Sequence, residues 1–281
     1  MSEGSDEYVL SAAKDHRVKF IRLWFTDILG FLKSVAIPVE QLEESLETGI
    51  GFDGSSVEGF ARINKSDMVA KPDPSTFQIL PFGPQEDGTV ARMFCDIIEP
   101  IGTPYQGDLR WVLKRNLRRA SDMGFTFYVS PELEYFYFKD TEMPLEGLDE
   151  GGYFDLAPLD GASDLRRETV LSLEGMGIEV ASSQHEIDLL YADALTMADN
   201  AMTYRLVVKE IALKHNVWAT FMPKPVYGEN GNGMRMHMSL FRCERNAFYD
   251  PNDAYHLSKL AKGYISGLLR HAREITLVTN Q

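Results

Sequence analysis

Strict alternation of apolar and polar side chains between residues 234 and 239 is the feature that most constrains this chain. Methionines alternate there with Arg235, His237 and Ser239. Successive side chains of a β-strand point to opposite faces, so the pattern predicts a strand with buried methionines and three polar groups on the other face. The preceding loop, "GENGNG" at 228–233, contains only Gly, Glu and Asn. It could bring its backbone close to a ligand or form a plain flexible turn, and His237 alone could be an ordinary sheet histidine.

The rest of the chain combines strand and helix patterns. Before residue 103 we expect strands at 18–27, 32–38, 76–82 and 89–98, a helix at 39–49, and a long connection at 51–75. Beyond it we expect helices at 109–123, 162–177, 197–216 and 251–275, with extended segments at 125–138, 178–191 and 217–223. This succession favours an α/β or α+β fold with a central sheet, in two domains of residues 1–102 and 103–281.

Composition excludes several classes of function. The formal net charge of −14 opposes binding to nucleic acid or to anionic membranes. Two cysteines, Cys95 and Cys243, cannot form a disulfide framework, which favours a reduced, cytoplasmic setting. The N-terminus is acidic and polar, unlike a signal peptide, and no apolar run is long enough to span a membrane. We therefore expect a soluble globular protein.

Acidic residues in the predicted strands carry the clearest chemical signal. Glu132 and Glu134 are two apart, so both carboxylates would leave the same face of a strand, with Cα atoms about 6–7 Å apart. Two such charges repel unless a cation lies between them. Glu179 and Glu186, on the next extended segment, could add oxygens, and oxygen donors favour Mg²⁺ or Mn²⁺. The alternative is that these glutamates form the wet face of a half-buried sheet.

Eight motifs, in order along the chain, resemble those of glutamine synthetases of the bacterial and archaeal type I class. They are "FDGSS" (52–56), "KSDMVAKPD" (65–73), "CDIIEPIGTPYQGDLR" (95–110), "PELEYF" (131–136), "GYFD" (152–155), "QHEID" (184–188), "ATFMPKP" (219–225) and "NGNGM" (230–234). The resemblance implies an α+β fold, with a β-grasp-like domain at 1–102 and an incomplete α/β barrel-like catalytic domain, with an open sheet, at 103–281.

The resemblance also implies a reaction. Enzymes of this family condense glutamate with ammonia through γ-glutamyl phosphate, with ATP as co-substrate and divalent metals in a funnel completed by the N-terminal domain of a neighbouring subunit. It therefore implies a ring-type homo-oligomer assembled through the N-terminal domain. Glutamate, ammonium and ATP are the implied small-molecule partners. A phosphoryl transfer to a carboxylate gathers negative charge, which metal ions neutralise.

The family's functional positions map onto this chain one by one. Glu134, Glu179 and Glu186 match the acids of one metal site, and Glu132 matches an acid of the other. Asn230 and Gly231 match the loop that binds glutamate. His237 and Ser239 match positions on the nucleotide side, and Asp53 and Tyr153 match the ammonium pocket. An acid and a phenol suit ammonium better than a bulkier amine, although a related ligase that uses another amine stays open.

Three departures from the family pattern bear on activity. Arg235 occupies the position of a histidine metal ligand, and a guanidinium has no lone pair to offer. It either pairs with Glu132 and replaces the second metal, or turns outward while a metal binds weakly with water. About seven residues are missing before "QHE", which could shift Glu179 out of reach. The chain also ends before other active-site segments of the family. The alternative to a ligase is thus a non-catalytic assembly protein or fragment.

Overall fold

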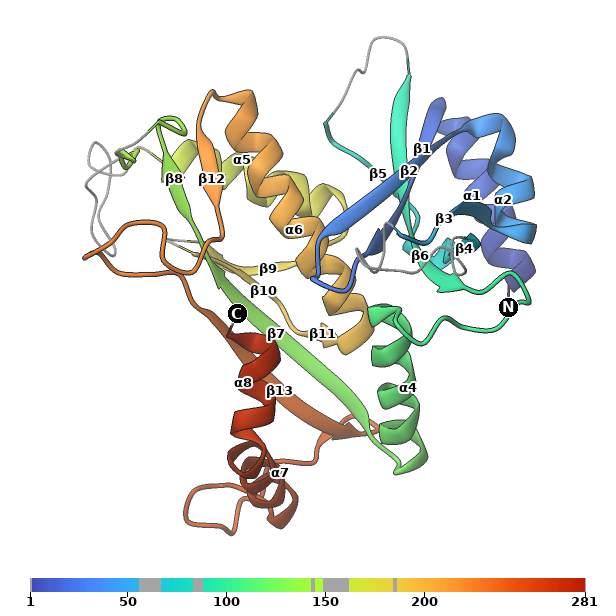
Figure 1. Cartoon of the computed structure of the whole chain (residues 1–281). Coiled ribbons are helices and arrows are strands. Elements are labelled where there is room, and N and C mark those ends of the chain that lie inside the picture. Colours follow the sequence, from blue (N-terminus) through green and yellow to red (C-terminus); the bar gives the residue numbers. More distant parts are fainter. Residues whose placement is uncertain are drawn as a thin grey trace.

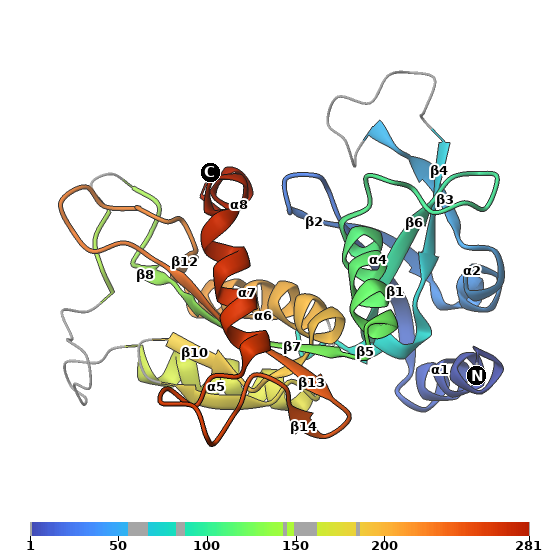
Figure 2. The same ribbon diagram turned by 90° about the horizontal axis from the view of Figure 1, so that it is seen from below.

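Two β-sheets, one from each half of the chain, lie side by side with helices between them (Figure 1). The computed structural model describes residues 2–55, 67–82, 88–142, 145–148, 162–183 and 186–280. Helix α4 (Leu109–Asp122) and the start of α6 (Ala194–Lys214) lie where the two sheets meet, as the view from below also shows (Figure 2). No helix in the described part of the chain is long and apolar enough to cross a membrane.

The first sheet has the strand order β2-β1-β6-β4-β3, with β5 also paired to β6. Its strands are β1 (Val18–Thr26), β2 (Leu32–Pro38), β3 (Ile50–Asp53), β4 (Asp67–Pro72), β5 (Gln78–Ile79) and β6 (Thr89–Ile98). Only β1 and β6 run parallel; the other pairs are antiparallel. The described residues of this half also form two helices, α1 (Ser2–Asp15) and α2 (Leu42–Thr48), and the 3-10 turns η1 (Val39–Gln41) and η3 (Pro74–Thr76). The arrangement is the expected β-grasp.

One face of the first sheet is buried along most of β1, and the opposite face is buried at Trp24. Ile21 and Leu23 join a core with α1 and α2, whose contributions include Val9 and Leu46. Trp24, on the other face, packs edge-on against Phe94 of β6 with ring centroids 5.6 Å apart and belongs to the core of the second half. The first sheet therefore contributes directly to the hydrophobic core that supports the second.

Three predictions for the first half need correction. The segment 51–75, expected as a connection, contains β3 and β4, which are too short for a clear period-two signal. The strand expected at 76–82 shrinks to β5 because η3, with Pro74 at its first turn, occupies its start. Helix α1 was missed because its apolar positions are sparse.

The second sheet has the strand order β14-β13-β7-β10-β9, with β11 also paired to β7. Its strands are β7 (Thr126–Glu134), β9 (Val180–Ser183), β10 (Glu186–Leu189), β11 (Ala192–Asp193), β13 (Met234–Arg242) and β14 (Arg245–Asn246). A separate pair joins β8 (Phe136–Phe138) to β12 (Trp218–Thr220). Where the structure describes this half, its other helices are α5 (Ser163–Gly175), α7 (Lys259–Arg270) and α8 (Ala272–Thr279). The sheet is open, as expected for part of a barrel-like domain.

The last predicted helix, 251–275, begins later and divides in two. Asp250 and Asp253 accept backbone N–H bonds within successive turns, so the chain stays non-helical up to residue 257. Ser258 then caps α7 by accepting from the amide of Ala261 at 3.1 Å. Local side-chain hydrogen bonds to the backbone thus compete successfully with helix formation in this segment.

The methionines of β13 have the predicted facing but not the predicted burial. The register places Met234 opposite Leu133 and Met238 opposite Val129, on the face that forms the core. Met238 contacts Tyr264 of α7, whereas Met234 and Met236 are 57% and 43% exposed. Among the described elements, α6 packs against β7, β11 and β12, and no helix covers this end of β13.

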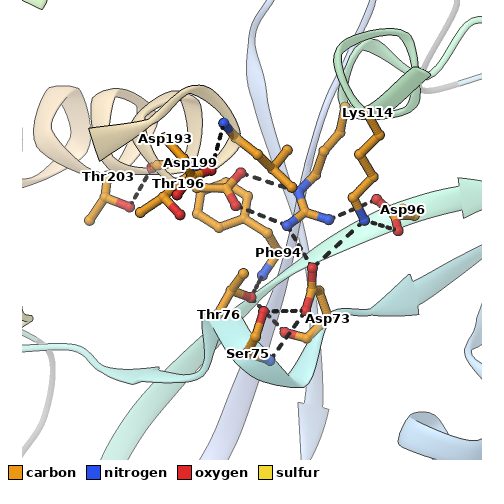
Figure 3. A network of polar contacts seen from close by, with 12 residues as sticks. Asp73, Ser75, Thr76, Phe94, Asp96, Lys114, Asp193, Thr196, Asp199 and Thr203 are labelled. Atoms are coloured by element: carbon orange, nitrogen blue, oxygen red, sulfur yellow. Dashed lines mark hydrogen bonds and ion pairs between the residues drawn. The ribbon is translucent and has the colours of Figure 1, made fainter. Parts of the chain in front are cut away.

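A buried arginine joins the two halves. Arg110 of α4 donates to Asp96 of β6 at 2.7 Å, to Asp73 after β4 at 2.8 Å and to Asp199 of α6 at 3.0 and 3.2 Å. Figure 3 shows Asp73, Asp96 and Asp199 converging, with Lys114 adding a 2.5 Å contact to Asp96. The five N–H donors of a guanidinium, in a rigid planar fork, are enough for these four contacts to three carboxylates, whereas a lysine ammonium has only three donors.

Arg110→Ala should lower the free energy of unfolding by about 3–5 kcal/mol, because it leaves three partly buried carboxylates without their shared cation. Urea unfolding followed by circular dichroism measures the change. Arg118→Ala is the matched control, since Arg118 is an exposed arginine of the same helix; it should shift stability by no more than about 0.5 kcal/mol. Equal effects of the two substitutions would contradict the junction's role.

The start of α4 depends on a buried acid. Asp108 is 1% exposed and accepts hydrogen bonds from the amides of Ile97, Arg110 and Trp111 at 3.1–3.2 Å. It caps the helix and ties it to β6. Burial raises the pKa of Asp108 to about 6, because desolvation of the carboxylate outweighs these hydrogen bonds.

This pKa predicts a pH-dependent stability. The folded state binds the Asp108 proton more tightly than the unfolded state, so the contribution of Asp108 is full below about pH 4 and is lost as pH rises through about 6. The loss is up to about 3 kcal/mol. Asp108→Asn imposes a pH-independent penalty, so unfolding free energies of both proteins between pH 4 and 7 should converge as pH rises. Parallel curves would refute the assignment.

Candidate carboxylate and nucleotide site

The register of the second sheet gathers acids around the end of β7. Glu132 and Glu134 lie on the same face of β7, opposite the face that carries the buried Leu133. On one side β10 places Glu186 directly opposite Glu134 and Asp188 directly opposite Glu132. The pairing brings four acidic positions from two strands to one face. Asp188 was missed by the sequence analysis, although it has the same two-residue spacing from Glu186 that singled out Glu132 and Glu134.

On the other side of β7, Arg235 and His237 of β13 bind Glu132. Arg235 is opposite Glu132 in the register, with its Nε 2.5 Å from Glu132 Oε2. His237 Nε2 lies 2.5 Å from Glu132 Oε1. The hydrogen bond to His237, followed by the charge of Arg235, lowers the pKa of Glu132 below its ordinary value. The predicted pairing of Arg235 with Glu132 is confirmed.

Glu134 is held by the glycine-rich loop. Its Oε2 accepts from the amide of Gly233 at 2.7 Å, and its backbone N–H donates to the carbonyl of Gly233 at 3.1 Å. Asn232 ties the loop to the end of β12 and the residues after it, because its side-chain amide donates to the carbonyls of Thr220 and Met222 at 3.4 and 2.9 Å. A Cβ at Gly231 would collide with the carbonyl of Pro223, so glycine is required there. The loop is therefore a braced structure and not a plain flexible turn.

A cleft of about 450 Å³ continues the site along β7 and β13. Aromatic side chains form part of its wall: the Tyr128 ring is edge-on to Tyr191 at 5.8 Å and to Phe241 at 5.0 Å. His237 and Ser239 also line it, and Ser239 accepts a hydrogen bond from Asn246 at 3.3 Å. His237 thus contacts Glu132 and lines the cleft at the same time.

The other predicted positions are spread more widely. Asn230 is exposed in the loop, near Gly231. Asp53 ends β3 in the first sheet, where it accepts from the amide of Ser55 at 2.9 Å; that bond lowers its pKa.

Glu179 is exposed and lies away from the other acids. Its carbonyl accepts from the amide of Leu190 at 2.9 Å, and Leu190 is four residues beyond Glu186. This is about 13 Å along the strand from the Glu134 end. Tyr153 and the side chain of Glu186 lie outside the described part.

The acids fit a divalent ion only in part. Arg235 and His237 each contact one oxygen of Glu132, and a metal ion there would lie beside the fixed positive charge of the guanidinium, so this carboxylate as placed fits a metal poorly. Within the described residues no group of three or more His, Cys, Asp or Glu side chains is arranged to hold an ion. Glu134, which faces Glu186 in the register, and Asp188, which faces Glu132, are the other acidic positions on this face that offer hard oxygen donors.

Two asparagines of the loop, one hydrogen-bonded to neighbouring carbonyls and one exposed, allow a matched test of the bracing. Asn232→Ala should cost about 1–2 kcal/mol in unfolding free energy, because it leaves two carbonyls without a donor, and should speed hydrogen exchange at the amide of Gly233. Asn230→Ala, at an exposed position two residues away, should leave both quantities unchanged. Thermal unfolding and amide exchange measured by NMR check the pair. Unchanged exchange at Gly233 in Asn232→Ala would contradict the bracing.

Both halves of the chain match models of one protein family. The family model of the glutamine synthetase β-grasp domain matches residues 17–100, and that of the glutamine synthetase catalytic domain matches residues 106–281. Curated glutamine synthetases of Mycolicibacterium smegmatis and Methanosarcina mazei are 53% and 52% identical, each over 98% of this chain. The chain spans 64% and 63% of the length of these two relatives.

Solved structures agree with the sequence relatives. Glutamine synthetase of Plasmodium falciparum superposes with a TM-score of 0.88 at 26% identity, covering 98% of this chain and 61% of that one. A GmaS complex with ADP superposes with a TM-score of 0.86 at 27% identity, covering 95% of this chain and 64% of that one. With both domains matched and the same fold found in solved members, the chain belongs to the glutamine synthetase family.

Proposed function

We propose that this chain forms part of an ATP-dependent ligase that condenses glutamate with ammonia through γ-glutamyl phosphate. The observation that carries the proposal is the position of His237, which lines the cleft and contacts Glu132. A nucleotide whose base lies against the Tyr128 wall would have its phosphates directed along β13 toward the acids. The names of the curated relatives and the ADP complex of GmaS support this reading.

The remaining components follow from the family and from the donors present. Mg²⁺ or Mn²⁺ suits the oxygen donors at Glu134 and Glu186 and would neutralise phosphate charge. Asn230 and Gly231 would contact glutamate from the braced loop. Asp53 and Tyr153 would serve ammonium in a neighbouring subunit, within a ring-type homo-oligomer assembled through the first sheet. A cytoplasmic location is part of the same proposal.

A second candidate is a non-catalytic member of the family. Arg235 favours it, since a guanidinium on Glu132 occupies a carboxylate that the resemblance assigns to metal. Such a protein would retain the cleft and the assembly surfaces without turnover. The two candidates differ in whether nucleotide binding is followed by phosphate release that requires both glutamate and ammonium.

Calorimetric titration of the purified chain with ADP and ATP, in the presence of Mg²⁺, should show saturable binding. His237→Ala should weaken it by about tenfold, the effect of one lost charge-assisted hydrogen bond. His16→Ala, an exposed histidine in the first half, is the matched control and should bind normally. Binding without glutamate- and ammonium-dependent phosphate release would favour the non-catalytic candidate, whereas an unaltered affinity in His237→Ala would contradict the assignment of the cleft.

A further inference from the structure

We propose that the guanidinium of Arg235 is a built-in cation that takes the place of one divalent ion beside Glu132 and Glu134. The site would then require fewer bound ions than one with a metal-ligating histidine at residue 235. This inference rests on the proposed function, because it concerns the charges that face the nucleotide. In this proposal Arg235 is the cation that neutralises Glu132, and nothing is proposed about ions at other positions.

Backbone geometry sets the position of Arg235. The antiparallel register pairs Arg235 with Glu132 across β13 and β7. Its Nε is 2.5 Å from Glu132, and its Nη2 is 3.9 Å from Glu134 Oε1, so one guanidinium faces both acids. The two backbone-anchored contacts between Gly233 and Glu134 hold the start of β13 against β7. The backbone pairing of β13 with β7, and not only the rotamer of Arg235, therefore places the guanidinium beside the two glutamates.

The chemistry of the group distinguishes it from a ligand. A guanidinium stays protonated and has no lone pair, so it cannot coordinate an ion at the position it occupies. It does supply a positive charge with a planar donor edge, which suits a carboxylate or a phosphate oxygen. An ion on Glu132 would share the carboxylate with the Arg235 guanidinium, whose Nε is 2.5 Å from Oε2, and two positive charges that close repel each other.

Stability does not account for the pair. The side chain of Arg235 is 61% exposed, and exposed ion pairs stabilise folded proteins little. The pairing also uses Glu132, one of only two acids on this face of β7 that the resemblance assigns to metal. Since stability does not explain the pair, we attribute it to charge: the guanidinium puts a fixed positive charge where a dissociable metal ion would otherwise bind. The competing arrangement, an outward Arg235 with a water-completed metal, predicts a different ion count.

Counting Mn²⁺ ions tests the inference without any measure of turnover. Free Mn²⁺ is followed by electron paramagnetic resonance during titration of the purified chain, Arg235→His and Arg235→Lys. Arg235→His should bind one more ion per chain, or bind Mn²⁺ at least about tenfold more tightly, since it restores an imidazole ligand beside two carboxylates. Arg235→Lys keeps a positive charge and should match the unsubstituted chain.

Two further variants make the result specific. Glu132→Gln in the Arg235→His background should remove the gained ion, which locates it at this carboxylate. Arg235→Gln, a neutral side chain of similar reach, should also gain a weaker ion, so the test does not depend on the folding of a single variant. Equal Mn²⁺ stoichiometry and affinity in the unsubstituted chain, Arg235→His and Arg235→Gln would overturn the inference.

The outcome separates this inference from the proposed function. An ion gained by Arg235→His in a chain that binds no ADP would support the built-in cation and contradict the nucleotide site. Normal ADP binding with no ion gained in any variant would do the reverse. Circular dichroism of each variant confirms that the comparison is made between folded proteins.

Discussion

The buried cation at the junction of the two halves is the interaction on which the rest of the structure depends. Arg110 is shared by carboxylates from β6, the turn after β4, and α6, so three elements distant in sequence have one fixed point. Burial by itself would lower the pKa of Arg110, but the hydrogen bonds and charges of Asp199, Asp96 and Asp73 together raise it well above its ordinary value. Asp108 fixes the same helix to β6 through the amide of Ile97. Because β7 begins four residues after α4 ends, the junction also sets where the acid-bearing strand starts.

From that starting point, β7 is the strand that assembles the candidate site. Two of its neighbours contribute in register: β10 brings acids, and β13 brings Arg235 and His237. A one-residue slip of either strand would turn these side chains to the opposite face and leave the two glutamates without partners. The core face of β7, with Val129 and Leu133 buried under α6, resists such a slip. Packing on one face therefore maintains the chemistry on the other.

The same sheet shows how a family site can change by one residue. With imidazole at 235, the two glutamates would offer their oxygens to an ion; with arginine, Glu132 already has a permanent cation at 2.5 Å. The fold tolerates the change because Arg235 lies on an exposed face and needs no core volume. We expect its effect on ion binding and little effect on folding, because an exposed ion pair stabilises a folded protein only slightly. The aromatic cleft and the braced glycine loop are independent of that substitution.

Local patterns in the sequence determined the strands and helices whose period was long enough to read, the facing of Met234 and Arg235, and the pair Glu132 and Glu134 on one face. Tertiary structure decided which partners these side chains contact and how deeply they are buried. Asp188 lies among the acids because β10 pairs with β7. Glu179 lies about 13 Å along the strand from the Glu134 end. Met234 is exposed because no described helix covers it. The reason is physical: alternation fixes the side of a strand from local geometry, whereas partners and burial depend on non-local register and packing, which one segment does not encode.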